Sequence, residues 1–193
     1  MSIPKETDYA RLRFDSGVAG YPAGLTLGNL AGLNADVLFT PGQAGGQPYY
    51  MLVFTDPTNG LGQTLATDQI LMLQFQPTTL SGNSLAFDPN TTLVNLFDNI
   101  TGIYLQGGQQ TTNTLAGWLT TFPFLAGHSL EQVRIAIGLA GGGSSPESLT
   151  VNSLTITTAT SVVPEPSSLL LLLSVVAATG WGIRRRKPRN SRS

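Results

Sequence analysis

Residues 132–139 read QVRIAIGL, and this stretch decides the class of fold that we expect. Its apolar side chains alternate with the others and share one face: Val133, Ile135, Ile137 and Leu139. Such alternation is typical of a half-buried β-strand. Two continuous apolar runs, residues 49–55 (YYMLVFT) and 69–75 (QILMLQF), favour strands in the middle of a sheet. The chain therefore contains sheet-forming segments on both sides of its middle.

Four more segments have a strand-like pattern, residues 10–14, 35–39, 102–106 and 149–157. In the last, the alternation slips by one residue near Thr150, which predicts a β-bulge and places Val151 on the face opposite to Leu154. Turn-forming residues such as Gly, Pro, Asn and Asp separate the runs. We read the glycine-rich residues 139–145 as a hairpin loop between two strands. Seven or more short strands predict an all-β fold, a β-sandwich or jelly-roll-like ectodomain.

One segment has helical instead of alternating spacing. Its apolar residues recur three or four positions apart: Leu115, Trp118, Leu119 and Phe122. Thr114 is a suitable N-cap and Pro123 would end the helix. We therefore predict one short helix over residues 114–122, crossing an end of the sheets.

The last thirty residues have three parts in a fixed order. Pro164, Glu165 and Pro166 form a stiff, extended element, because proline restricts both its own φ and the residue before it. Residues 167–183 carry no charge and are long enough to span a membrane as a helix. A basic tail, residues 184–192, begins with Arg184, Arg185, Arg186 and Lys187. A basic cluster after an apolar span stays on the cytoplasmic side, so the residues before the span are expected outside the inner membrane.

This order, Pro-Glu-Pro, apolar span and arginine cluster at the end of a chain, resembles the PEP-CTERM sorting signal. The resemblance implies an exported protein that passes through an inner-membrane intermediate and reaches the cell envelope or the extracellular space. It implies a partner, the membrane-embedded transpeptidase exosortase, which cleaves near the Pro-Glu-Pro element. An ordinary single-pass anchor that is never cleaved is the alternative. Residues 114–156 also loosely resemble the end of the jelly-roll-like ectodomains found in this family.

The resulting domain organisation has three parts: residues 1–8, a β-sandwich ectodomain at 9–160 and the sorting signal at 161–193. Residues 1–14 contain no apolar stretch of the kind that a signal peptide has. Because the tail implies export, we expect that the true start lies upstream of Met1 or that the N-terminal segment is truncated.

Composition excludes several classes of function. Six of the ten basic residues follow Ile183, so the part before residue 163 has ten acidic and four basic residues, a net charge of about −6. An acidic domain has no electrostatic footprint for nucleic acid. The absence of cysteine removes disulfides, thiolate metal sites and a cysteine nucleophile.

Candidate catalytic residues are sparse. His128 is the single histidine, too little for a zinc site or a Ser-His triad, and we read it as a loop or cap residue. The carboxylates are scattered, mostly beside Pro, Thr or Asn, where they usually stabilise turns: Asp56, Asp68, Asp88, Asp98, Glu131 and Glu147. We therefore expect no enzymatic activity and no required cofactor, and a secreted polysaccharide-acting hydrolase is the rival hypothesis.

Two weaker candidates concern binding. Many jelly-roll modules hold calcium between an early acidic residue and a last-strand aspartate; Asp15 and Asn152 occupy the corresponding positions here, although an amide is a poorer ligand than a carboxylate. Four tyrosines are candidate stacking platforms for carbohydrate: Tyr21, Tyr49, Tyr50 and Tyr104. The family resemblance links the system to bacteria that make exopolysaccharide. We accordingly expect a non-enzymatic envelope or extracellular-matrix protein with carbohydrate or matrix binding.

Overall fold

The computed structural model describes residues 10–40, 47–75, 80–108, 111–137 and 148–159. The chain divides into two units, residues 1–159 and 160–193, and every described residue belongs to the first. The Pro-Glu-Pro element, the apolar span and the basic tail lie outside the described residues. Within the described ranges, no helix has the length and apolar character needed to cross a membrane.

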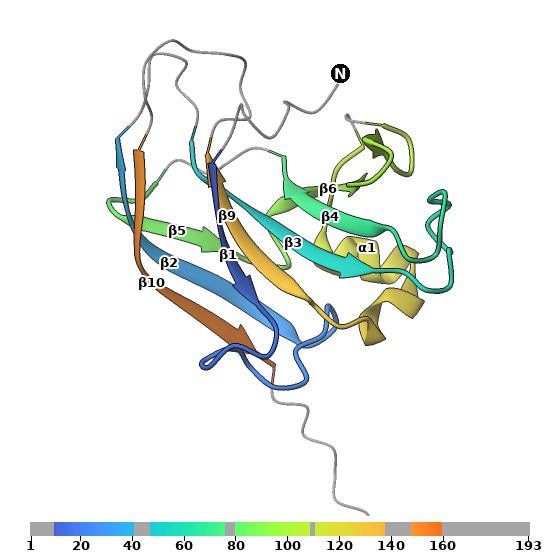
Figure 1. Ribbon diagram of the computed structural model, residues 1–193, viewed down its shortest axis with the longest axis horizontal. Helices are drawn as coiled ribbons and strands as arrows, with labels where there is room; N and C mark the ends of the chain where they lie inside the picture. The colour runs from blue at the N-terminus through green and yellow to red at the C-terminus, as the bar shows by residue number, and fades with distance from the viewer. Residues whose placement is uncertain (1–9, 41–46, 76–79, 109–110, 138–147, 160–193) are drawn as a thin grey trace, which may run out of the picture. The chain divides into compact units, whose positions relative to one another are not determined.

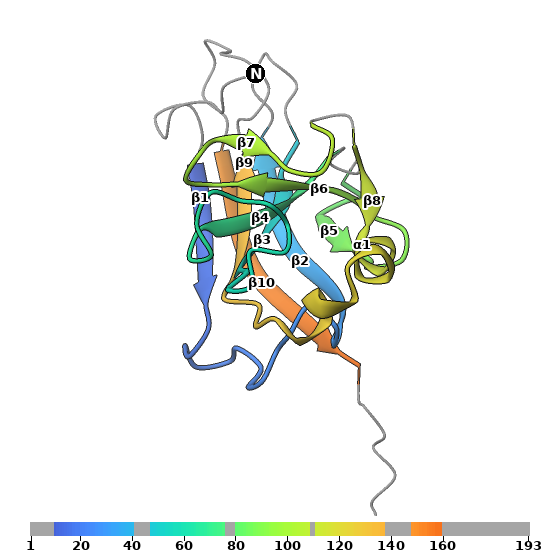
Figure 2. The same cartoon turned by 90° about the vertical axis from the view of Figure 1, so that its right-hand side faces the viewer.

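The described chain is mostly β, with two antiparallel sheets (Figures 1 and 2). The larger sheet has the order β1-β9-β3-β4-β6-β7, and β8 also pairs with β6. Its strands are β1 Ala10–Asp15, β3 Tyr49–Thr55, β4 Gln69–Gln74, β6 Leu93–Asp98, β7 Ile103–Tyr104, β8 Asn113–Thr114 and β9 Gln132–Ile137. The smaller sheet has the order β10-β2-β5, with β2 Leu30–Thr40, β5 Ser84–Phe87 and β10 Ser148–Thr158.

A single apolar core joins the two sheets. Leu33, Ala35 and Val37 of β2 point into it from the smaller sheet, and Leu52 and Phe54 of β3 from the larger one. All are at most 3% exposed. Burying a side chain of this size contributes about 1.5–3 kcal/mol, so this core is the main source of stability.

The larger sheet is apolar on its other face as well. A second cluster lies there, made of Tyr49, Met51, Val53, Leu71, Leu73, Phe97 and Ala136, with the ring of Tyr104 packed edge-on against Phe97. Residues from both faces of β3 are therefore buried. This explains why residues 49–55 form a continuous apolar run instead of an alternating one.

The helix forms where its sequence pattern predicts. α1 spans Leu115–Thr121, and Thr114 caps it by accepting a hydrogen bond from the Gly117 N–H at 3.0 Å. Trp118 is buried and its Nε1 donates to the Val94 carbonyl of β6 at 3.0 Å. A short 3-10 helix, η2 (Pro123–Gly127), follows directly, so Pro123 ends the α-helix as expected.

Several strand predictions need correction. Strands β5, β6 and β8 were not predicted, β2 begins at Leu30, well before the expected residue 35, and β7 is only two residues long. β7 is short because Gln106, just beyond it, has a φ of 54°, which strand backbone does not allow. Residues 139–145 lie outside the described residues, but the predicted hairpin is wrong, because the flanking strands β9 and β10 belong to different sheets.

The predicted bulge in the last strand is present, slightly displaced. The register of β10 against β2 shifts between Val151 and Ser153, which leaves Asn152 as the extra residue. Val151 therefore shares the inner face with Leu149, Leu154 and Ile156, contrary to our assignment. The apolar pattern alone located the irregularity to within two residues but misplaced one side chain.

Candidate binding groove

The connection from β1 to β2 lines a surface depression in the described chain. Val18, Ala19, Gly20 and Tyr21 border two adjoining hollows of about 380 and 280 Å³. The first continues along residues 16–25 to Ser129 and Leu130. The second opens between the end of β1 and the strand β10, where Leu154 and Ile156 form its wall. Together we call these two hollows the β1–β10 groove.

Glycine determines the path of this connection. Gly17 and Gly20 have φ values of 88° and 91°, a region that side chains disfavour. The Val18 N–H donates to Asp15 O at 3.3 Å and the Tyr21 N–H donates to Val18 O at 3.0 Å, which gives two successive turns. These turns return the chain over the end of β1 and place the Tyr21 ring in the groove.

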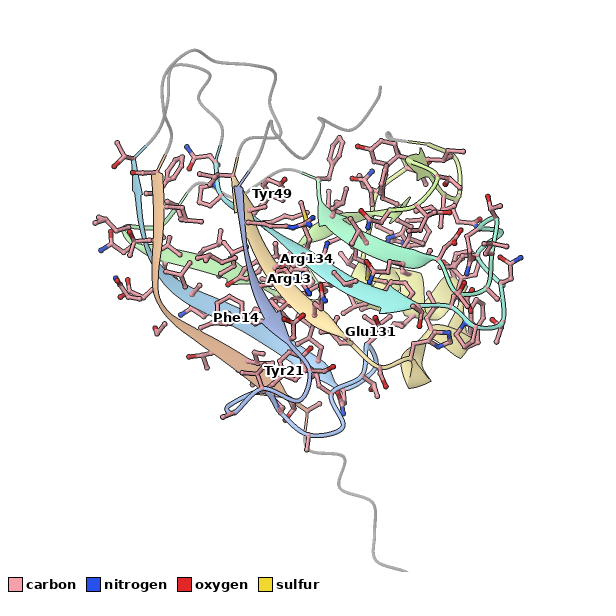
Figure 3. All side chains as sticks on the ribbon, in the orientation of Figure 1. Arg13, Phe14, Tyr21, Tyr49, Glu131 and Arg134 are labelled. Carbon is pink, nitrogen blue, oxygen red and sulfur yellow. The ribbon has the colours of Figure 1, made fainter. Side chains whose placement is uncertain are left out.

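Tyr21 is held in position by the neighbouring segment (Figure 3). Its hydroxyl donates to the Leu130 carbonyl at 2.6 Å. Burial raises the pKa of Tyr21 above its ordinary value, and the nearby negative charges of Asp15 and Glu131 raise it further. The phenol therefore stays neutral and remains a donor, so the ring is a fixed, half-buried wall of the groove.

The charged residues of the groove, Arg13 and Asp15, lie on its β1 side. Arg13 donates to the Asp15 carboxylate at 3.0 Å, and both side chains are more than 40% exposed. An exposed ion pair of this kind stabilises the fold by about 1 kcal/mol at most, so its groups remain available to a ligand. Phe14, between them, turns toward the core and contributes apolar surface to the groove. A tyrosine wall beside exposed donors and acceptors suits a ligand with apolar and polar faces, such as a sugar.

The two calcium candidates have different surroundings. Asp15 ends β1 in the larger sheet and accepts from Arg13, whereas Asn152 lies at the bulge of β10 in the smaller sheet and donates to Asp36 at 3.1 Å. The described ranges contain no group of three or more His, Asp or Glu side chains that could hold a metal. A calcium ion at Asp15 and Asn152 stays a prediction, with Asn152 already engaged by its own neighbour.

The four candidate tyrosines fall into two groups. Tyr49 and Tyr50 are at most 3% exposed, and the Tyr50 hydroxyl donates to Leu85 O at 2.9 Å, so neither ring offers a stacking surface. Tyr104 is half-buried against Phe97. Tyr21 is the one of the four that lines the groove. The sequence could not separate these rings, because their burial depends on which segments pack against them in the folded chain.

His128 has a structural role, as the sequence suggested. Its Nδ1 lies 3.0 Å from the Phe124 carbonyl and its Nε2 lies 3.1 Å from Oδ1 of the fully buried Asp56. Each ring nitrogen therefore has a structural partner within hydrogen-bond distance. Neither nitrogen is left to act as a general base, and the pair fastens η2 to the loop after β3.

The predicted turn role of the acidic residues is confirmed at four positions. Asp56 accepts from the N–H groups of Thr58 and Leu61, at 3.1 and 3.0 Å, and Asp98 accepts from those of Ile100 and Thr101. In the same way, Asp68 bonds the Leu65 N–H and Asp88 the Asn90 N–H. Glu131 instead accepts from the Thr55 hydroxyl at 2.8 Å. Glu147 lies outside the described residues.

The comparisons with known proteins identify the tail. The family model of the PEP-CTERM protein-sorting motif matches residues 162–187. This β-rich chain therefore carries a PEP-CTERM sorting signal in its C-terminal segment. The motif indicates an exported protein that is sorted at the membrane by exosortase. No curated protein and no solved structure matches the chain.

Proposed function

We propose that this chain is a non-enzymatic protein of the cell envelope or extracellular matrix, delivered through its sorting tail and cleaved there by exosortase. The match to the sorting motif at residues 162–187 is the observation that carries this proposal. In this proposal, residues 167–183 span the inner membrane until cleavage near Pro164, Glu165 and Pro166, and residues 184–187 remain on the cytoplasmic side.

The two sheets and their shared core support a β-sandwich, jelly-roll-like ectodomain as the exported part. We propose that this ectodomain binds carbohydrate, with matrix exopolysaccharide as the ligand class, in the β1–β10 groove. The fixed Tyr21 ring and the exposed Arg13–Asp15 pair support this assignment. The engagement of both His128 nitrogens by structural partners supports binding over hydrolysis.

The sorting step is tested by the mass of the mature protein in cells with and without exosortase. We expect loss of residues 167–193 only where exosortase is present. A full-length tail in both strains would favour an uncleaved single-pass membrane protein and overturn the cleavage step.

The binding step is tested on a glycan array with the full chain in detergent micelles. Tyr21→Ala removes the aromatic wall and should weaken binding roughly tenfold, which corresponds to about 1.4 kcal/mol. Ile103→Ala is the matched control, since Ile103 is 58% exposed on β7 and does not line the groove. Equal binding by both variants would remove the groove from the proposal, and release of free sugar from a bound polysaccharide would favour the hydrolase.

A further inference from the structure

The exposed edges of the two sheets differ in a way that points to an interaction surface. Edge strands offer unpaired backbone groups to other chains, and proteins usually protect them by shortness or charge. β5 is four residues long and β7 and β8 two each, while β1 carries Arg11, Arg13 and Asp15 among its six residues. β10 is eleven residues long, without charge or proline, and among the described strands it pairs only with β2 (Figure 1). Within the described sheets it is the one long edge that lacks both kinds of protection.

The inner face of β10 is also incompletely covered. Val151, Leu154 and Ile156 lie against the core but are only half-buried, whereas their partners on β2 are at most 3% exposed: Val37, Ala35 and Leu33. Leu154 and Ile156 form the wall of the β1–β10 groove. A further strand beside β10 would continue the smaller sheet and extend its inner apolar face.

The order of side chains along β10 is a palindrome centred on its bulge. Residues 149–152 read Leu-Thr-Val-Asn and residues 153–156 read Ser-Leu-Thr-Ile, which is apolar, Thr, apolar, polar followed by polar, apolar, Thr, apolar. The bulge reverses the alternation of side chains between the core face and the outer face of β10. Because of this reversal, β10 can pair antiparallel with β10 of a second copy in one register that places core-facing residues opposite core-facing residues along the whole strand. In it, Thr150 lies opposite Thr155 of the second copy, and Val151 lies opposite Leu154 of the second copy.

We propose that β10 is a homodimerisation edge, which pairs antiparallel with β10 of a second copy about a two-fold axis at the bulge. Such an interface is isologous, so the same residues serve both chains. The absence of charge means that no like charges meet, and the opposed threonines are a favourable cross-strand pair. Pairing joins the two smaller sheets into one six-stranded sheet across the dimer.

The test uses disulfide cross-linking of the full chain in detergent micelles, with copper-phenanthroline as the oxidant. The native chain has no cysteine, so the engineered thiols are the only ones present. Thr150→Cys and Thr155→Cys are made separately, both at exposed positions on the outer face. In the proposed register the thiol at position 150 of one copy lies directly opposite the thiol at position 155 of the other, within disulfide reach. Each engineered thiol lies five residues, about 17 Å, from its own equivalent in the second copy, which is too far.

We expect a cross-linked dimer from an equal mixture of the two variants and no dimer from either variant alone. Cross-linking of the separate variants at the yield of the mixture would overturn the proposed register and the proposal with it. Absence of dimer in all three samples would overturn it as well, provided that the variants melt like the native chain.

Sedimentation of cysteine-free chains gives a second measurement that does not depend on oxidation. Thr150→Glu/Thr155→Glu brings carboxylates face to face across the two-fold axis and should convert the dimer to monomer. Leu38→Glu/Ala86→Glu adds the same charge to the outer face of β2 and β5 and should leave the dimer intact. A native chain that sediments as a monomer, or an equal loss of dimer in both variants, would contradict edge pairing.

Discussion

The substitution Asp56→Asn tests whether the loop after β3 is held by a buried carboxylate. Oδ1 of Asp56 accepts from the Thr58 N–H and hydroxyl, at 3.1 and 2.5 Å, and from His128 Nε2 at 3.1 Å. Oδ2 accepts from the Leu61 N–H at 3.0 Å. An asparagine amide has one acceptor oxygen and one NH2 group, so it can satisfy only one of these two sides.

The magnitude follows from the donor that loses its acceptor. If the amide oxygen keeps Thr58 and His128, its NH2 group faces the N–H of the buried Leu61, donor against donor. A buried donor without a partner costs about 1–3 kcal/mol. Leu61 is only 2% exposed, so water cannot replace the lost acceptor, and we expect a cost in the upper part of this range, about 2–3 kcal/mol in the free energy of unfolding. In a chain of this size, that lowers the melting temperature by roughly 4–12 °C.

The assay is thermal unfolding of the full chain in detergent, followed by circular dichroism, with Asp88→Asn as the matched control. Asp88 bonds the Asn90 N–H at 2.8 Å in an exposed turn, where water replaces the lost acceptor, so its substitution should cost less than about 1 kcal/mol. An Asp56→Asn variant that melts with the native chain would refute the reasoning, because it would show that the carboxylate does not stabilise the loop.

The native chain and the Asp56→Asn variant should also differ in how their stability depends on pH. Burial raises the pKa of Asp56, but the hydrogen bonds from Thr58, Leu61 and His128 outweigh it, so the pKa lies below its ordinary value of 3.8. A lowered pKa adds stability above the pKa of the unfolded state, and this stability is lost as the pH falls through the folded-state value. The difference in stability between the native chain and Asp56→Asn should therefore be constant near neutrality and shrink below about pH 4.

Two further predictions concern the helix and the core. Thr114→Ala removes the side-chain acceptor for the Gly117 N–H and should cost about 1 kcal/mol in chemical denaturation, whereas Thr114→Ser should restore most of it; equal stability of the alanine and serine variants would contradict the cap. Burial raises the pKa of Tyr50 well above its ordinary value, and a backbone hydrogen bond only partly offsets this. Tyr50→Phe should therefore leave the tyrosinate absorbance of the folded chain unchanged up to about pH 11, while the unfolded variant shows one ionising tyrosine fewer than the unfolded native chain. A drop in tyrosinate absorbance of the folded variant near pH 10 would place the ring in water.

The raised pKa of Tyr50 also makes the stability of the native chain depend on pH in alkali. Because its pKa is raised in the folded state, the contribution is complete below the unfolded value near 10 and is lost as the pH rises above it. Native stability should therefore fall in mild alkali, and less so in the phenylalanine variant.

The sequence predicted correctly those elements that depend on interactions between residues close together in the chain. The Thr114 cap and the stop at Pro123 depend on contacts within one helical turn, so the helix was predicted nearly to the residue. The continuous run at residues 49–55 predicted β3 because its apolar character does not depend on which strands flank it. The sorting tail is of the same kind, since the order of proline, apolar span and basic cluster is itself the signal.

Strands β5 and β6 escaped prediction because their residues are fitted to neighbours far away in the chain. Asn95 interrupts the apolar run of β6, and it is buried where its Nδ2 donates to the Thr111 carbonyl, 16 residues further along the chain. The pairing partners of β9 and β10 were misjudged for the same reason: adjacency in sequence suggested a hairpin, whereas core packing placed them in separate sheets.

By itself, the sequence determined that the chain is rich in strands, that it has one capped helix and that it ends in a sorting signal, because each of these is written in neighbouring residues. Only the tertiary structure decided that Tyr21 lines a groove while Tyr50 is core, that His128 is fastened to Asp56, and that β10 forms an unprotected edge. These features depend on which segments pack together in the two sheets. Whether a side chain is buried is decided by that packing and not by the residues next to it in the sequence.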